Sequence, residues 1–478
     1  MILVRGKFVV IAVAAIFMLS VTGLVFRAWS RNNQTDYFVA TFDIRQEANP
    51  PTRGIFMDRS GQPITDPFFA PQVMGFARGD FLWGLEAQHH EALEAGHNIV
   101  TTLDSDIQRL AQQYVDNTLI NHPSQFVGMI VMKPFTGEIL AMAQAPNFST
   151  ADPFNPDYFT CPQLVEVWDS LSESQRVERV MTLWRNYHTT RSSEPSATFK
   201  PFVIAAAFEE GYIDSHSVFY CEGRRYINDQ SVWCHNIWGC GMLSLRRSLY
   251  RSCNMAMVYI NEGLGRDLFY QYRGYFGFGA QTGIGLPNEA DVSSRYVMYP
   301  WARLHAVEMA NSAMGQGFQA TTMQMINGYA ALINGGNLMR PFIVSQVIND
   351  RNIVVHENLP HVTRRAIAGE TSNFIRNEMR YVVAMQPSVG ELSGTGWRSY
   401  IEGVSVGGKT GTALQGDRES YNYTLTYIAF FPVEDPQFLV LLTLDNPIDN
   451  ERPSAGYVVA PIVREFLVDL IEMKNLLT

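Results

Sequence analysis

The feature that most constrains this chain is an apolar stretch near its N-terminus, which runs from Phe8 to Phe26 and contains no charged residue and no proline. Its length matches the roughly 20 residues that a membrane-spanning helix requires. A cleaved signal peptide would have a shorter apolar core and a small-residue cleavage site, which the following segment RAWSRNN does not offer. We therefore predict an uncleaved anchor at residues 8–26.

The flanks of this stretch indicate an orientation. Arg5 and Lys7 precede it, although Arg27 and Arg31 follow it, and a short basic end most simply stays in the cytoplasm. The prediction is a cytoplasmic tail at 1–7, a single pass through the cell (cytoplasmic) membrane, and the bulk of the chain on the extracytoplasmic side.

Composition indicates a folded chain of several domains. Of the 478 residues, 46% are hydrophobic and 12% are aromatic, which is enough to bury a large core in two or three domains. The formal net charge is −10, and no basic run is present. This charge disfavours a nucleic-acid partner, because phosphate binding depends on surplus Lys and Arg, and we expect none.

Three of the five cysteines crowd the segment CEGRRYINDQSVWCHNIWGC. Because disulfides persist outside the cytoplasm, we predict one disulfide and a spare thiol here. A zinc site is the alternative, but the spacing matches no common zinc-finger pattern. We expect no metal and no cofactor, and the alternative metal ligands are Cys221, Cys234, His235 and Cys240.

The apolar pattern after residue 100 predicts an α+β fold. The segment after Asp104 has apolar residues at helical spacing behind an aspartate cap. In FVGMIVMKPFTGEILAMAQAP, two apolar runs surround KPFTGE, which is typical of a β-hairpin. The runs YTLTYIAFFP and FLVLLTL predict two closing strands. Together these elements favour an antiparallel sheet covered by helices.

The segment EPSATFKP, residues 194–201, predicts a helix with Pro195 in its first turn and Lys200 one turn later. A serine one turn before such a lysine can act as a nucleophile, because the helix dipole stabilises its oxyanion and a buried amine can take its proton. The residue three positions before the lysine is Ala197, and the serine in this turn is Ser196. Taken alone, Lys200 is more often a solvated helix lysine.

Two further motifs carry polar groups suited to the same chemistry. The segment RSCNMA places a serine hydroxyl and an asparagine amide two residues apart. The hydroxyl can relay a proton and the amide can hold a substrate carbonyl. The usual explanation of such a pair is a helix-capping serine followed by a polar turn residue. In VGGKTGTALQ, the glycines let a ligand approach the strand closely, and the lysine and threonine side chains can bind its carboxylate. The alternative is a lysine on an edge strand, which protects against aggregation. The residues concerned are Ser252, Asn254, Lys409, Thr410, Gly411 and Thr412.

In chain order, the three motifs follow the S-x-x-K, S-x-N and K-T-G signature of penicillin-binding proteins and class A β-lactamases, except at residue 197. Further segments extend the likeness, among them RGIFMDRSGQPIT, TLDSDIQRLAQ, YFGFGAQTGIGLP and GGKTGTA. Over nearly everything after the anchor, the chain resembles class B penicillin-binding proteins, the single-pass peptidoglycan transpeptidases. The resemblance implies a pedestal at 27–125 and a transpeptidase domain at 126–478.

The resemblance also implies roles for single residues. The family motif EPGSTFKP lies over EPSATFKP without a gap, so its glycine corresponds to Ser196, its nucleophilic serine to Ala197 and its base to Lys200. Ser252 would relay a proton and Asn254 would hold the substrate amide. The strand from 409 to 412 would grip the terminal carboxylate of a D-alanyl-D-alanine stem peptide. The implied reaction transfers the acyl group to a neighbouring stem, and β-lactams imitate the substrate.

Ala197 admits three interpretations, because a methyl group cannot attack a carbonyl. The chain is a natural pseudoenzyme, or Ser196 has become the nucleophile, or alanine replaces a natural serine to trap or silence the enzyme. We disfavour Ser196, because a one-residue rotation of about 100° re-aims the hydroxyl. We prefer the replacement, because the other motif residues are intact.

By the same resemblance, the partner is a membrane-embedded glycan polymerase of the shape, elongation, division and sporulation family. A scaffold that holds or activates this polymerase is the alternative to an enzyme. A secreted β-lactamase would carry neither anchor nor pedestal. Roles in elongation, division and sporulation are all compatible with these motifs.

Overall fold

The computed structural model describes residues 52–291, 298–387, 393–415, 422–448 and 453–476. Nearly all of them belong to the second of two compact units, Arg53–Thr478. The predicted tail and anchor at 1–26 lie outside the described residues. Within the ranges given above, no helix combines the length and the apolar character needed to cross a membrane.

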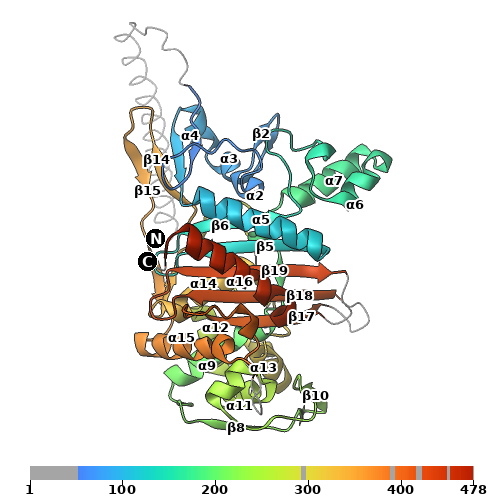
Figure 1. Ribbon diagram of the computed structural model, residues 1–478, viewed down its shortest axis with the longest axis vertical. Helices are drawn as coiled ribbons and strands as arrows, with labels where there is room; N and C mark the ends of the chain where they lie inside the picture. The colour runs from blue at the N-terminus through green and yellow to red at the C-terminus, as the bar shows by residue number, and fades with distance from the viewer. Residues whose placement is uncertain (1–51, 292–297, 388–392, 416–421, 449–452, 477–478) are drawn as a thin grey trace, which may run out of the picture. The chain divides into compact units, whose positions relative to one another are not determined.

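A five-stranded antiparallel sheet forms the centre of this unit (Figure 1). The predicted hairpin is its β5–β6 pair, and the predicted closing strands are β18 and β19, so these predictions are confirmed. In spatial order the strands are β17 (Gly407–Gln415), β18 (Asn422–Phe431), β19 (Phe438–Pro447), β5 (Ser124–Met132) and β6 (Ile139–Ala145).

Helices cover both faces of the sheet, as expected for the predicted α+β class. Successive side chains of a strand point to opposite faces, so Tyr427 and Ile428 belong to different apolar cores. The core on the first face includes residues of α5 (Ser105–Asn121) and α16 (Ala455–Met473). The core on the second face includes residues of α9 (Lys200–Glu209), α11 (Asn254–Leu264), α14 (Thr322–Ile333) and α15 (Gly369–Ala384).

Helix α5 begins where the sequence predicted. The carboxylate of Asp104 accepts hydrogen bonds from the backbone N–H groups of Asp106 and Ile107, both at 3.2 Å. Ile107 is buried and packs in the same core as the central strands. The predicted limit between 27–125 and 126–478 falls inside β5, and residues on both sides of it belong to one compact unit. These domain limits therefore stay a prediction.

Residues distant in sequence also pair outside the central sheet. Strands β1 (Phe56–Met57) and β4 (Asn98–Thr101) form a four-stranded sheet with β14 (Val344–Ile348) and β15 (Val354–Glu357). The segment before α5 is thus held by a hairpin from the second half of the chain.

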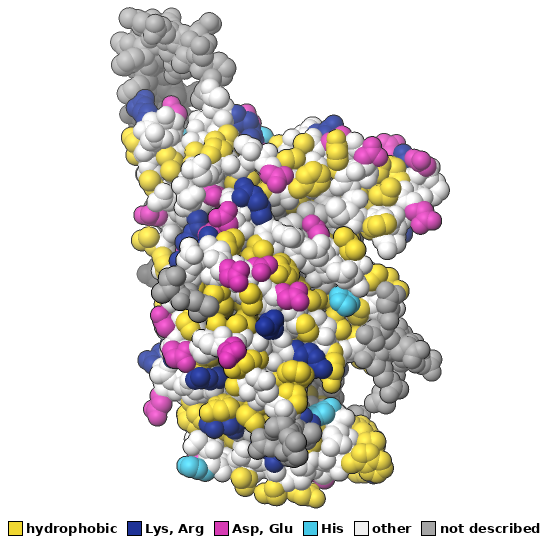
Figure 2. Space-filling model, in the orientation of Figure 1, with side chains coloured by type: hydrophobic (Ala, Val, Ile, Leu, Met, Phe, Trp, Pro, Cys, Tyr) yellow, Lys and Arg dark blue, Asp and Glu magenta, His cyan; other side chains and the backbone are white. Residues whose placement is uncertain are grey.

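Two strand pairs lie near α11, at the end of the unit opposite α4 (Figure 1). Several large apolar side chains of these strands and of the turn after β10 are exposed, including Tyr220, Tyr226, Trp238 and Met242. Figure 2 shows hydrophobic side chains gathered at this end. The pairs are β8 (Val218–Cys221) with β11 (Gly241–Ser244), and β9 (Arg224–Ile227) with β10 (Gln230–Trp233).

Candidate active site

The three sequence motifs meet in one cleft of about 430 Å³. The first motif contributes from the start of α9, the second from the loop before α11, and the third from the edge strand β17. The predicted site residues that line the cleft are Ser196, Ala197, Lys200, Ser252, Asn254, Thr410 and Thr412. Lys409 and Gly411 lie on the same strand as the two threonines, beneath this surface.

A 3₁₀ turn, Ser196–Phe199, precedes α9. Ser196 has a φ of 51°, in the left-handed region that favours glycine. Its hydroxyl donates to the carbonyl oxygen of Thr412 at 2.7 Å. Ala197 is half-buried in the cleft wall. The backbone therefore presents residue 197 to the cleft and ties residue 196 to β17.

Lys200 is buried, with a residual exposure of 1%. Its ammonium group donates to the Ser252 carbonyl at 2.5 Å, to the Ser252 hydroxyl at 3.2 Å and to Asn254 Oδ1 at 2.6 Å. Burial lowers the pKa of Lys200 from 10.5 to about 8. Nearby thiols, of which Cys253 has the largest effect, raise this pKa by a smaller amount. The alternative of a solvated helix lysine is therefore wrong.

A second buried amine lies on the other side of Ser252. Lys409 donates to the Ser252 hydroxyl at 3.0 Å and to the Thr410 carbonyl at 3.0 Å. Burial, and then the neighbouring Lys200, lower the pKa of Lys409 well below its usual value. Lys409 is fully buried, so it is not an exposed edge-strand lysine. The Ser252 hydroxyl thus lies between two amines whose simultaneous protonation is unfavourable.

Asn254 is held at both ends of its amide. Its oxygen accepts from Lys200, and its nitrogen donates to the Trp233 carbonyl at 2.8 Å. Because a primary amide has two N–H donors, one remains for a substrate carbonyl. Ser252, two residues earlier, has a φ of 57°, so the loop before α11 has a strained conformation of the kind that clusters at functional sites.

Strand β17 packs directly against the 3₁₀ turn. A Cβ added to Gly411 would lie 2.8 Å from Cγ2 of Thr198, so glycine permits this approach. The Thr412 hydroxyl accepts from the backbone N–H of Ala455, the first residue of α16, at 3.1 Å. The third motif therefore links the 3₁₀ turn Ser196–Phe199, the sheet and α16.

The sequence analysis missed part of the cleft wall. Arg398 lies over the rings of Trp397 and Tyr457, at 4.5 Å and 3.6 Å from their centroids, and all three residues line the cleft. Arg251 and His235 line it too. The available signal was proximity in sequence for Arg251, which precedes the second motif, and for His235, which lies in the cysteine segment. Trp397 and Arg398 belong to a 3₁₀ helix and Tyr457 belongs to α16, and no motif marks these positions. The guanidinium groups of Arg251 and Arg398 suit an anionic ligand.

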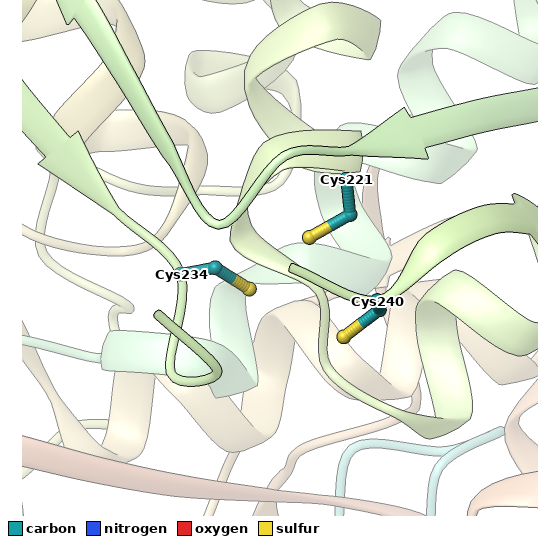
Figure 3. A group of neighbouring side chains, drawn as sticks. All are labelled: Cys221, Cys234 and Cys240. Carbon is teal, nitrogen blue, oxygen red and sulfur yellow. The ribbon is translucent and has the colours of Figure 1, made fainter. Parts of the chain in front are cut away.

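The cysteine segment lies beside this site and differs from the prediction. All five cysteines are free thiols, so the described residues contain no disulfide. The sulfur atoms of Cys221, Cys234 and Cys240 lie within 4.8 Å of one another (Figure 3). The predicted disulfide is therefore absent, because the strand pairs bring three sulfur atoms together and leave no isolated pair. His235 Nδ1 lies 3.6 Å from the Cys234 sulfur.

Known sequences resemble this chain over most of its length. Stage V sporulation protein D of Bacillus subtilis is 31% identical over 390 residues, which cover 80% of this chain and 55% of that protein. Penicillin-binding protein PbpB of Mycolicibacterium smegmatis is 27% identical over 399 residues, covering 82% of this chain and 57% of that protein. The chain thus spans a little over half the length of these relatives.

Solved structures share the fold. Penicillin binding protein 3 of Mycobacterium tuberculosis, complexed with aztreonam, superposes with a TM-score of 0.76 at 24% identity, covering 89% of this chain and 97% of that one. A D,D-transpeptidase domain from Eggerthella lenta gives 0.74 at 23% identity, with 90% and 100% coverage. The family model of the penicillin binding protein transpeptidase domain matches residues 127–468. This chain belongs to that transpeptidase family.

Proposed function

We propose that this chain has the site of a peptidoglycan D,D-transpeptidase and that its covalent step requires serine at residue 197. The observation that carries the proposal is the buried amine of Lys200, which contacts Ser252 and Asn254 one turn after residue 197 in the same cleft. A pKa of about 8 leaves part of this amine neutral near pH 7, as a general base requires.

In the Ala197→Ser protein, the neutral Lys200 amine accepts the hydroxyl proton while the oxygen attacks the carbonyl carbon of the penultimate D-alanine. The peptide bond to the terminal D-alanine then breaks, and the leaving nitrogen takes a proton from the Ser252 hydroxyl. The protonated Lys200 amine gives its proton to Ser252 in turn. The amine of a neighbouring stem peptide then attacks the ester and releases the serine. Each proton lost by a nucleophile is thus returned to a leaving group.

The third motif binds the substrate carboxylate in this proposal. An anionic carboxylate favours the charged form of a nearby amine, so its arrival favours protonation of the buried Lys409. The threonines at 410 and 412 supply hydroxyl groups on the cleft side of the same strand. A β-lactam carries a carboxylate and an acyl centre, so it would occupy the same positions.

With Ala197 the cleft can bind such ligands but cannot form an ester. Labelling with a fluorescent penicillin tests this directly: the unaltered chain should give no covalent adduct and Ala197→Ser should give one. The double variant Ala197→Ser/Lys200→Met is the matched control and should not label. A folded Ala197→Ser protein that stays unlabelled would refute the proposal. Labelling of the unaltered chain that is lost in Ser196→Ala would identify Ser196 as the nucleophile.

One observation favours a second candidate, a non-catalytic scaffold. The chain departs from EPGSTFKP at two neighbouring positions, 196 and 197, whereas silencing a nucleophile needs only one change. As a scaffold, the chain would hold a membrane-embedded glycan polymerase through an anchor at 8–26 and a pedestal at 27–125. Co-purification from detergent tests this interface. Unchanged recovery of the polymerase after exchange of 8–26 and deletion of 53–65 would show that the interface is wrong.

A further inference from the structure

The free thiols beside the cleft come from separate segments that the fold brings together. Cys221 ends β8, Cys234 follows β10 and Cys240 precedes β11. Cys221 and Cys234 are buried and Cys240 is half-buried. Figure 3 shows the three side chains grouped together.

The spacing of these sulfur atoms suits a tetrahedral metal ion. Zinc–thiolate bonds of about 2.3 Å place neighbouring sulfur atoms about 3.8 Å apart. The three sulfur atoms already lie within 4.8 Å of one another, so a contraction of less than about 1 Å completes this geometry. A disulfide would use two of them and leave the third thiol buried against it.

A fourth thiol lies near two of the first three. Cys253 is fully buried, and its thiol interacts with the thiols of Cys234 and Cys221. His235 also approaches Cys234, but its side chain is exposed and lines the cleft. Cys253 is therefore the better placed fourth ligand.

The backbone around the thiols is arranged as at a preformed site. The sulfur of Cys253 accepts a hydrogen bond from the backbone N–H of Ala256 at 3.5 Å, so this thiol is fixed as the N-cap of α11. The turns pack so closely that a Cβ on Gly239, whose φ is 83°, would lie 2.4 Å from the Cys221 carbonyl oxygen. Cys240 N–H donates to that same carbonyl at 3.0 Å. These contacts hold the ligand-bearing turns together without a metal.

We propose that Cys221, Cys234, Cys240 and Cys253 form a structural site for a thiophilic divalent cation, with zinc as the expected ion. Thiolates in a closed tetrahedral set are the ligands that structural zinc prefers. The site would join both strand pairs to the loop before α11. Cys253 lies between Ser252 and Asn254, and Asn254 also bonds the carbonyl of Trp233, the neighbour of Cys234. The ion would therefore position the second motif.

Metal analysis of the full chain, purified in detergent under reducing conditions without chelators, tests the site. About one equivalent of zinc per chain is expected, and cobalt substitution should give the visible bands and sulfur-to-cobalt charge transfer of tetrahedral thiolate coordination. Cys221→Ser, Cys234→Ser, Cys240→Ser and Cys253→Ser should each lose most of the bound metal. Cys161→Ser is the matched control, because Cys161 lies outside the cluster, and it should keep the metal.

The cobalt spectrum of the unaltered chain tests the site even where a serine variant fails to fold. A zinc content near zero after zinc exposure and dialysis, with all five thiols open to a thiol reagent, would overturn the proposal. So would mass-spectrometric detection of a disulfide within the cluster in the purified, air-exposed chain. Metal loss in His235→Ala but not in Cys253→Ser would overturn the assigned fourth ligand. None of these readouts depends on acylation, so they are separate from the proposed function.

Discussion

The acylation rate of Ala197→Ser should rise steeply with pH around neutrality, because only the neutral amine of Lys200 can accept a proton. Burial disfavours the charged amine and lowers its pKa from 10.5 to about 8. At pH 7.5 about a quarter of such an amine is neutral, compared with about one part in a thousand for an ordinary lysine. Burial therefore increases the available base by roughly 200-fold.

The measurement is the second-order rate constant for labelling by a fluorescent penicillin at low concentration, because this constant reports the free protein. Between about pH 6 and pH 8 it should rise about 50-fold and then level off above about pH 9. Lys133→Met is a control on a surface lysine outside the cleft and should leave the profile unchanged. A flat profile, or a rise centred near the pKa of an ordinary lysine, would refute the assignment of Lys200 as the base.

Three substitutions test the packing around the site through the free energy of unfolding in denaturant. Gly411→Ala places a Cβ 2.8 Å from Thr198 and should cost about 1–3 kcal/mol; an unchanged midpoint would show that β17 does not press on this turn. Arg246→Ala removes both hydrogen bonds, at 2.8 Å and 2.9 Å, to the buried carboxylate of Glu378 and should cost about 1–2 kcal/mol, whereas Arg246→Lys should recover part of this loss. Trp184→Ala empties the centre of an aromatic cluster and should cost about 3–5 kcal/mol, with faster proteolysis near this cluster as a second readout.

Elements with a local signal could be predicted from the sequence. The Asp104 cap acts within one turn, so the start of α5 was predicted correctly. The β5–β6 hairpin is encoded by two apolar runs and a short polar turn. The convergence of the three motifs could be predicted only through their order in a known family, because no local rule brings Lys200, Ser252 and Lys409 together.

Pairings between distant segments could not be predicted. The sheet that joins β1 and β4 to β14 and β15 depends on residues about 250 positions apart, and neither partner shows its register in its own pattern. The disulfide prediction among Cys221, Cys234 and Cys240 was wrong for the same reason. The turns that carry these cysteines are set by the β8–β11 and β9–β10 pairs, and Cys253 lies outside the segment that the spacing rules consider. The disulfide prediction used sequence proximity, which does not fix how many sulfur atoms converge.

The geometry of residue 196 bears on all three interpretations of Ala197. The left-handed φ of Ser196 is a conformation that disfavours a residue with a Cβ, which is consistent with the glycine of the resembled motif EPGSTFKP at this position. The hydroxyl of Ser196 partly offsets this cost through its bond to the Thr412 carbonyl, on the strand proposed to bind the substrate carboxylate. To act as a nucleophile, Ser196 would have to give up that bond and rotate by about a third of a 3₁₀ turn. The geometry therefore disfavours Ser196 as a substitute nucleophile, as the proposed dependence of acylation on residue 197 requires.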